Sequence, residues 1–244
     1  MKTTARPRTP PRAVIAAARR APRGVRRVGL LGGTFNPVHL AHLRCAEEVR
    51  EAQGLERVLF IPSAVPPHKA GAEVVAAEHR LAMVRLAVAG NRAFRVSTIE
   101  IRRAGHSYSV DTLRLLHARL PGCRFVFILG MDAFRDIATW KEYAAIFGLC
   151  DIVVISRPPD DQAPGLDALP IAVRSAFCYG SSKLEMCHTT GCCIRFQRIS
   201  ALDISASSIR QRLQAGRSIR YLVPLSVERY IARHGLYVPR GAAH

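Results

Sequence analysis

The stretch VGLLGGTFNPVHLAH, residues 28–42, carries the strongest local signal in the chain. Its apolar start, Val28 to Leu31, predicts a short buried strand that breaks at the paired glycines. After Pro37, apolar residues recur with helical spacing towards Gln53, which predicts a helix. A strand, a glycine turn and a helix start together form an anion-binding site, because glycines let the backbone come close and the first helical N–H groups point at a phosphate.

Two histidines stand at the start of this predicted helix. His39 and His42 are three residues apart, so on a helix they share one face at the end where a phosphate would bind. The pattern differs from the G-x-G-x-x-G dinucleotide motif and from the P-loop with its Lys-Ser/Thr ending. An alternative is a glycine turn followed by two surface histidines. We expect a phosphate site whose turn consists of Gly32, Gly33, Thr34, Phe35 and Asn36.

Composition allows a folded domain with anionic ligands. The chain has 244 residues, 49% of them hydrophobic, which suits one large or two modest domains. No run approaches the ~20 apolar residues that span a membrane. The net charge of +18 suits substrates that are polyanions, and it would also suit weak nucleic-acid binding. Charge by itself does not separate these two classes.

Half of the excess charge lies in residues 1–27, which hold nine basic side chains and no acidic one. This stretch has few large apolar residues to bury, so we expect a disordered basic arm followed by one domain over 28–244. The apolar run Ala13 to Ala18 is too short for a secretory signal. An organellar transit peptide, a tether to nucleic acid or anionic surfaces, and a solvated tail without function remain open.

After the first motif, predicted strands and helices alternate. This pattern predicts a Rossmann-like α/β fold, a doubly wound parallel sheet with a small C-terminal helical part. Ligands in such sheets bind beyond the carboxyl ends of the strands. The pattern weakens over 158–198, which we interpret as a variable insertion that contains cysteines. The predicted strands are 28–31, 57–61, 94–101, 124–129 and 151–156, and the predicted helices are 78–89, 109–120, 140–147, 204–214 and 226–234.

A second phosphate site is predicted at Ile204 to Arg210. Ser205 and Ser207 stand where hydroxyls cap a helix start, and the free N–H groups there attract anions. Arg210 offers a planar donor fork for phosphate oxygens. Alone, this segment is also typical of an ordinary capped amphipathic helix. Two anion sites far apart in the sequence can clamp one triphosphate.

Both segments resemble motifs of the nucleotidyltransferase superfamily of adenylyl- and cytidylyltransferases, G-G-T-F-[DN]-P-x-H-x-[GA]-H and I-S-[SA]-T-x-I-R. Ser207 replaces the usual Thr and keeps the hydroxyl. Within the superfamily, the chain resembles the bacterial nicotinate-nucleotide adenylyltransferases over about 28–157 and 199–238. This narrower resemblance rests on Pro66-Pro67-His68-Lys69, Ser107-Tyr108-Ser109 before Asp111-Thr112-Leu113, Gly130-Met131-Asp132 with Trp140, and Arg157-Pro158.

The resemblance implies a role for each of these residues. Trp140 would stack on the pyridine ring of the acceptor, and Tyr108 and Ser109 would hold its carboxylate. Gly130 and Asp132 would meet the ribose or adenine side of ATP, and Ile204 belongs to the second phosphate motif. Lys69 and Arg157 would neutralise acceptor or triphosphate charge. From the residues alone, Trp140 is equally typical of a core, Asp132 of a helix N-cap, and Lys69 and Arg157 of ordinary surface cations.

The implied reaction transfers AMP from ATP to nicotinate mononucleotide, giving nicotinate adenine dinucleotide and pyrophosphate in NAD biosynthesis. Mg²⁺ would accompany the triphosphate, and His39, His42 and Arg210 would act on the phosphates as catalytic residues. We expect a cytoplasmic enzyme, with homo-oligomerisation left open. Alternatives are an adenylyltransferase for nicotinamide mononucleotide or another phosphate acceptor, and a basic nucleic-acid-binding protein.

Four of the seven cysteines cluster inside the 158–198 segment, together with a histidine. Soft ligands gathered in this way can hold Zn²⁺, although the spacing lacks the C-x₂-C pairs of well-formed zinc sites. Reduced thiols in a variable insertion are the interpretation that we favour. The residues concerned are Cys178, Cys187, His188, Cys192 and Cys193.

Overall fold

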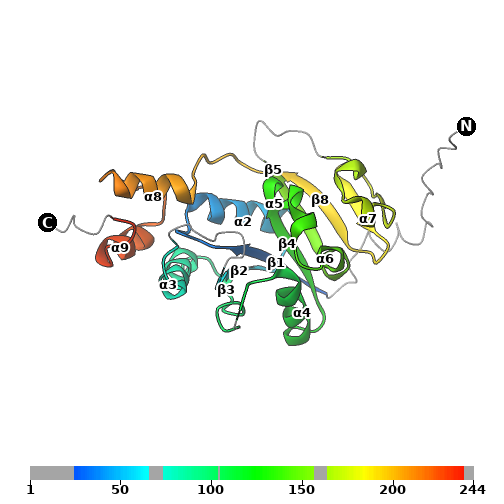
Figure 1. Cartoon of the computed structure of the whole chain (residues 1–244), viewed down its shortest axis with the longest axis horizontal. Helices are drawn as coiled ribbons and strands as arrows, with labels where there is room; N and C mark the ends of the chain where they lie inside the picture. Colours follow the sequence, from blue (N-terminus) through cyan, green and yellow to red (C-terminus); the bar gives the residue numbers. More distant parts are fainter. Residues whose placement is uncertain (1–24, 66–73, 104, 157–163, 239–244) are drawn as a thin grey trace, which may run out of the picture.

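The computed structural model describes residues 25–65, 74–103, 105–156 and 164–238. Within these residues the chain forms one eight-stranded sheet in the order β3-β2-β1-β4-β5-β8-β7-β6 (Figure 1). The strands β1 to β5 and β8 pair in parallel, and β7 runs antiparallel to both β8 and β6. The strand bounds are β1 Arg26–Gly33, β2 Arg57–Pro62, β3 Phe94–Val96, β4 Cys123–Gly130, β5 Asp151–Ser156, β6 Phe177–Tyr179, β7 Glu185–His188 and β8 Cys193–Arg198.

Helices cover both faces of this sheet (Figure 1). One apolar core joins the strands to α4, α5, α6 and α7, and a second core joins them to α2, α3, α8 and α9. The predicted doubly wound α/β fold with a small C-terminal helical part is therefore confirmed. The helix bounds are α2 Leu40–Ala52, α3 Ala77–Val88, α4 Ser109–Arg119, α5 Met131–Arg135, α6 Tyr143–Leu149, α7 Ile171–Arg174, α8 Ala206–Gln214 and α9 Leu225–Arg233, with the short 3₁₀ turns η1 Ile137–Thr139 and η2 Leu166–Ala168.

The strand order locates the crevice of the sheet. From β1 the chain goes to β2 and β3 on one side, and then returns to β4 and β5 on the other side. The connections at the carboxyl ends of β1 and β4 therefore leave in opposite directions, which opens a crevice between them. The first motif follows β1 and Gly130 ends β4. The fold thus brings two of the predicted segments to one place.

Three sequence predictions need correction. The strand predicted over 94–101 ends at Val96, because residues 97–103 turn towards α4. Arg26 and Arg27, which we assigned to the basic arm, are the first residues of β1 and pair with Cys123 and Arg124 of β4. Residues 1–24 lie outside the described residues.

The third correction concerns the segment 158–198. Its described part contains β6, β7 and β8, and β8 pairs in parallel with β5 from Ile194 to Arg198. The segment therefore extends the main sheet by three strands. The strand signal is weak there because β6 and β7 are only three and four residues long, and β7 and β8 mix apolar with charged residues.

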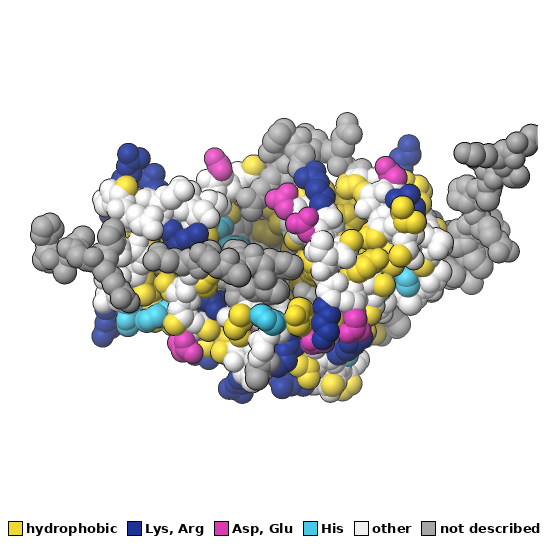
Figure 2. Space-filling model, in the orientation of Figure 1, with side chains coloured by type: hydrophobic (Ala, Val, Ile, Leu, Met, Phe, Trp, Pro, Cys, Tyr) yellow, Lys and Arg dark blue, Asp and Glu magenta, His cyan; other side chains and the backbone are white. Residues whose placement is uncertain are grey.

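The surface charge and the length of the helices bear on whether the protein binds nucleic acid or crosses a membrane. On the face shown in Figure 2, lysine and arginine side chains are scattered among acidic ones, without one continuous basic patch. No helix among the described residues combines the length and the apolar character required to cross a bilayer.

Candidate active site

The turn after β1 is shaped by side chains that pack beneath it. Phe35 adopts a left-handed backbone with φ of 50° and is 3% exposed, and the Asn36–Pro37 peptide is cis. The Phe35 ring packs against Phe60, with ring centroids 6.0 Å apart. A Cβ atom at Gly33 would lie 3.2 Å from the same ring, so a side chain there would press on the packed phenylalanine. The glycine and the buried aromatic ring together keep the backbone of the turn close to the cavity.

The two histidines lie together at the start of α2, as the spacing predicted. Their ring centroids are 3.7 Å apart, and the His39 backbone N–H donates to His42 Nδ1 over 3.2 Å. Because Nδ1 of His42 accepts this hydrogen bond, the proton of the neutral ring is assigned to Nε2. His42 lines the cavity described below, whereas His39 is 4% exposed and caps the helix. His42 is thus the histidine that presents a donor to a ligand.

The second predicted phosphate segment joins the first one directly. Nη1 of Arg210 donates to the Asn36 carbonyl over 2.8 Å, across 174 residues of sequence. Nη2 of Arg210 lies 3.3 Å from the Ser207 hydroxyl, which accepts its N–H. Asn36 Oδ1 also accepts the Tyr237 hydroxyl over 2.9 Å, and burial raises the Tyr237 pKa well above its usual range. Arg210 of α8 and Tyr237, which follows α9, therefore both hold the turn through Asn36.

Ser205 and Ile204 begin this second segment as predicted. Ser205 is the N-cap of α8, and its hydroxyl accepts the Ser208 backbone N–H over 3.0 Å. Ile204 packs against the core that contains α2, α3 and α9. The capping hydroxyl and the apolar anchor fix the start of α8, and with it the position of Arg210 one turn later.

A cavity of about 380 Å³ opens between the carboxyl ends of β1 and β4. One side comes from the first motif, with Gly32, Gly33, Thr34 and His42. The other side comes from the β4 and α4 region, with Gly130, Ser109 and Trp140. Residues from four predicted segments therefore line one cavity at the switch point of the sheet.

Trp140 stands where an aromatic ring can stack. Its indole contacts Phe127 edge-on, with ring centroids 6.1 Å apart, and one part of it lines the cavity. Ser109 is the first residue of α4 and also lines the cavity. Tyr108 is the N-cap of α4, its backbone N–H donates to the His106 carbonyl over 3.2 Å, and Lys141 Nζ lies 5.0 Å from the centroid of its ring. Ser109 is thus the member of the Tyr108–Ser109 pair that faces the cavity.

The N-cap interpretation of Asp132 is wrong. Gly130 is the N-cap of α5, and Asp132 is the second residue of that short helix, with a side chain that is 98% exposed and 3.5 Å from Arg135. Lys69 and Arg157 lie outside the described residues.

Sequence reasoning missed several polar residues of this site. Ser63 follows β2, is 8% exposed and lines the cavity, and its hydroxyl has no hydrogen-bond partner among the described residues. Glu100 also lines the cavity at 8% exposure. Burial raises the Glu100 pKa, while hydrogen bonds from Thr112 and Ser107 and the charge of Arg103 act in the opposite direction. Arg80 is 1% exposed, and burial lowers the pKa of its guanidinium.

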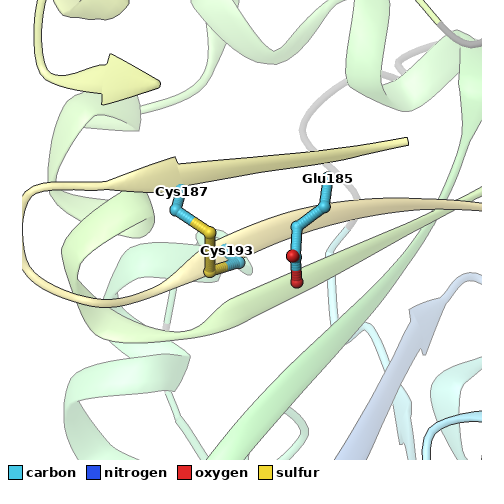
Figure 3. Close-up of side chains that lie close together, drawn as sticks. All are labelled: Glu185, Cys187 and Cys193. Atoms are coloured by element: carbon cyan, nitrogen blue, oxygen red, sulfur yellow. A yellow bond between two sulfur atoms is a disulfide. The ribbon is translucent and has the colours of Figure 1, made fainter. Parts of the chain in front are cut away.

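The cysteine cluster does not form the site that its sequence suggested. Cys187 and Cys193 are joined in a disulfide between β7 and β8, beside Glu185 (Figure 3). The Cys178 thiol donates to the Cys187 carbonyl and the Cys192 thiol to the Gly148 carbonyl, each over 3.6 Å. His188 Nδ1 lies 2.9 Å from the Thr190 hydroxyl. The interpretation as reduced thiols is therefore wrong for Cys187 and Cys193 and is confirmed for Cys178 and Cys192, and the five residues do not converge on one zinc site.

Comparison with known proteins agrees with the geometry. A sequence model of the cytidylyltransferase-like family matches residues 30–212. A probable nicotinate-nucleotide adenylyltransferase of Geobacter sulfurreducens is 52% identical over 215 residues, covering 88% of this chain and 100% of the relative. Its counterpart in Geotalea daltonii is 51% identical over 211 residues, covering 86% and 98%. The chain belongs to the nicotinate-nucleotide adenylyltransferase family of cytidylyltransferase-like proteins.

Solved structures support the fold independently. The nicotinic acid mononucleotide adenylyltransferase of Plasmodium falciparum, solved as a complex with NaAD, superposes with a TM-score of 0.66 at 16% identity. The alignment covers 87% of this chain and 97% of the Plasmodium chain. A putative nicotinate-nucleotide adenylyltransferase of Vibrio parahaemolyticus gives a TM-score of 0.59 at 15% identity, covering 87% of this chain and 95% of that one. The fold is thus shared with proteins that are only 15–16% identical in sequence.

Proposed function

We propose that this chain transfers the AMP moiety of ATP to nicotinate mononucleotide, giving nicotinate adenine dinucleotide and pyrophosphate, in NAD biosynthesis in the cytoplasm. The observation that carries the proposal is the hydrogen bond from Arg210 to the Asn36 carbonyl. It joins the two predicted phosphate segments, and the first of them lines, through Gly32, Gly33, Thr34 and His42, a cavity that also presents Trp140 and Ser109. Family membership supports the same reaction.

The chemistry follows from the ionisation of the substrates. The 5′-phosphate of the mononucleotide is already an anion at neutral pH, so its oxygen attacks the α-phosphorus of ATP without a general base, and pyrophosphate leaves in line with the attack. Catalysis then consists of bringing the two phosphates together and stabilising the charge that develops on the α-phosphoryl oxygens and the bridging oxygen. A site rich in N–H donors suits this task.

His42 and Arg210 are the donors that we assign to this charge. The His42 Nδ1 atom accepts the His39 N–H, which leaves Nε2–H directed to a phosphate oxygen. His39 holds the His42 ring in that orientation through this bond and the ring contact at 3.7 Å. The Arg210 guanidinium meets the triphosphate from α8, and Ser205 and Ser207 place it there. The backbone of Gly32, Gly33 and Thr34 cradles the phosphates, and Phe35 and Asn36 keep this turn in shape.

The other end of the cavity takes the two organic groups. Trp140 stacks on the pyridine ring, and Tyr108 and Ser109 contact its carboxylate. Gly130 and Asp132 meet the ribose or adenine of ATP, and Lys69 and Arg157 neutralise substrate charge. The cation–π attraction between an indole face and a positively charged pyridinium ring favours a mononucleotide over a neutral pyridine.

Mg²⁺ fits this site as a companion of ATP. Among the described residues that line the cavity, the one carboxylate is Glu100, and its oxygens receive the Thr112 and Ser107 hydroxyls. The donor set therefore suits an ion held by phosphate oxygens and water, as Mg²⁺ usually is, and it does not resemble an acidic cage. Bound in that way, Mg²⁺ neutralises part of the triphosphate charge.

The proposal is tested by measuring pyrophosphate release from ATP with nicotinate mononucleotide and, in parallel, with nicotinamide mononucleotide. We expect kcat/KM to be higher for the nicotinate compound. A preference for the nicotinamide compound would assign the chain to the alternative acceptor. Salt-sensitive binding of DNA or RNA, without pyrophosphate release from either mononucleotide, would favour the nucleic-acid alternative instead.

A further inference from the structure

Arg80 is a buried cation that binds only carbonyl groups among the contacts of the described residues. Its Nη1 atom donates to the Thr34 carbonyl over 2.8 Å and to the Ser63 carbonyl over 2.7 Å. Its Nη2 atom donates to the Ala64 carbonyl and its Nε atom to the Val75 carbonyl, each over 3.0 Å. One planar guanidinium therefore ties the turn after β1 to the end of β2 and to the residues that precede α3.

A second set of hydrogen bonds continues from Ala64 towards α4. The Ala64 backbone N–H donates to the Ser107 hydroxyl over 3.0 Å, and that hydroxyl in turn hydrogen-bonds Glu100. The Thr112 hydroxyl donates to Glu100 Oε1 over 2.8 Å. Thr112 lies in the first turn of α4, three residues after Ser109 at the helix start. Glu100 thus fixes both the loop and the helix turn that form the acceptor end of the cavity.

The two sets share Ala64, whose carbonyl binds Arg80 and whose N–H binds Ser107. Hydrogen bonds therefore run without a break from Thr34 in the turn after β1 to Thr112 in α4, close to the predicted acceptor contacts. We propose that Arg80 and Glu100 are positioning residues of one buried network, which sets the distance and angle between the bound ATP and the bound mononucleotide. This inference rests on the proposed function, because it assigns the network to the alignment of those two substrates.

The physical reason is the narrow tolerance of in-line transfer. The attacking oxygen must approach phosphorus to about 3–3.5 Å along one direction, and a displacement of about 1 Å can cost about 10²-fold in rate. Binding of each substrate alone depends on its own contacts and tolerates such a shift much better. A network that joins the two ends of the cavity therefore acts on kcat, and acts little on the affinity for either substrate by itself.

Three variants test this. Arg80→Lys keeps the positive charge and loses the planar fork that reaches four carbonyls. Glu100→Gln keeps the shape and loses one of the two oxygens that receive hydroxyls. The third variant combines both substitutions. For each variant, kcat is measured for pyrophosphate release, and Kd is measured separately for ATP and for nicotinate mononucleotide.

We expect each single substitution to lower kcat at least about tenfold, with both Kd values changed less than about threefold. We expect kcat of the double variant to be little lower than kcat of the less active single variant, because the effects of substitutions within one network are not additive. Met83→Ala is the matched control for stability. Met83 is 0% exposed on the same helix as Arg80 and packs in the core, so this variant lowers Tm while kcat below Tm stays close to that of the wild type.

Three results would overturn the proposal: single variants with wild-type kcat, a kcat loss matched by weaker binding of either substrate alone, or a double variant whose loss equals the product of the single losses. Circular dichroism and Tm identify a variant that has not folded, and Arg80→Gln then replaces Arg80→Lys with the same expectations. Wild-type protein that releases no pyrophosphate overturns the proposed function and this inference with it. Normal wild-type turnover with unaffected variants overturns the inference alone.

Discussion

The carboxyl end of β1 and the antiparallel strands β6 and β7 are both rich in polar side chains, yet they use them differently. At β6 and β7 most polar groups pair with other protein groups: Glu185 accepts Arg195 Nε over 2.8 Å and the Ser181 hydroxyl over 2.8 Å, beside the disulfide of Figure 3. Arg195 Nη1 makes no hydrogen bond among the described residues and lies 3.7 Å from Asp151 Oδ2. Beside the carboxyl end of β1, the hydroxyl of Ser63, the residue after β2, is buried without a partner among the described residues, and His42 lines the cavity. The polar groups of β6 and β7 therefore hold structure, whereas Ser63 and His42 line the cavity in which we propose that the substrates bind.

The largest expected effect on turnover is at the cavity beside the carboxyl end of β1. Substituting His42→Ala removes the donor that we assign to the charge on the transferred phosphoryl group, so kcat falls at least about 10²-fold. The measurement is pyrophosphate release at saturating ATP and nicotinate mononucleotide. Near-normal turnover would remove His42 from the proposed mechanism.

His39 provides the matched comparison within the same region. His39 is 4% exposed and reaches the substrates only through His42, so His39→Asn, which can also cap a helix, lowers kcat less than His42→Ala. A larger loss for His39→Asn than for His42→Ala would reverse the two roles.

The next effect concerns the acceptor end of the cavity. Trp140→Ala removes the ring that faces the acceptor, and an aromatic contact of this kind contributes about 1 kcal/mol beyond its buried area. We expect KM for the mononucleotide to rise about tenfold, with KM for ATP little changed. Trp140→Phe keeps a flat face and recovers most of the affinity. Equal increases in both KM values would show that Trp140 supports the fold of the whole cavity.

The sequence could predict the features that depend on local patterns, but not those that depend on how distant segments pack together. From 26 to 156 the central strands are short apolar runs that are buried on both faces, and the helices follow an apolar period of 3.6. The predicted strand 151–156 agrees with β5 residue for residue. Both phosphate segments were found because glycines, histidines and capping serines stand in a fixed order. The hydrogen bond between Arg210 and Asn36 was not predictable in its atoms, because it depends on how α8 packs beside α2.

Buried charge is the feature that sequence reasoning missed. Arg80 occupies an ordinary polar position of the periodic helix α3, and nothing in that pattern separates an exposed arginine from one that is 1% exposed. Glu100 lies in a turn where we predicted a strand. The disulfide was missed because the spacing of its cysteines, with five residues of β-hairpin between them, does not give the register of the two strands.

A smaller effect, on stability, is expected at a contact between α2, which follows the turn after β1, and the residues after β8. Glu48 on α2 accepts the Ser200 backbone N–H over 2.8 Å, just after β8. Burial would raise the Glu48 pKa, but hydrogen bonds from Ser200 and Arg44 outweigh it, and the net shift is downward. A carboxylate with a lowered pKa adds stability above its unfolded pKa, and this stability is lost as the pH falls through the folded pKa.

Glu48→Gln is therefore expected to lower the free energy of unfolding by about 1 kcal/mol at pH 7. The difference from wild type shrinks as the pH falls below about 4.5. Urea unfolding at pH 7 and at a pH below about 4.5 measures this difference in the free energy of unfolding. Turnover at pH 7 is expected to change less than about threefold. Glu51→Gln, an exposed change on the same helix, is the control, and an equal loss in that variant would contradict the role of the Ser200 contact.

The smallest effect on turnover is expected from the antiparallel region. Because Cys187 and Cys193 are 1% exposed and sit among groups that pair with one another, replacing both by Ser leaves kcat and both KM values within about twofold of wild type. Under oxidising conditions the free energy of unfolding falls by about 2 kcal/mol, since the unfolded chain loses one cross-link that closes a short loop.

Addition of a thiol reductant to the wild type should abolish this stability difference, and Cys178→Ser, which leaves the disulfide in place, is the control. A tenfold loss of turnover in the double variant would contradict the division between the two regions. It would mean that β7 and β8 act on the cavity through β5, whose Ile155 lines it. Polar groups that pair with one another, away from the cavity, would then influence catalysis. The contrast between these groups and the residues that line the cavity would no longer identify the active site.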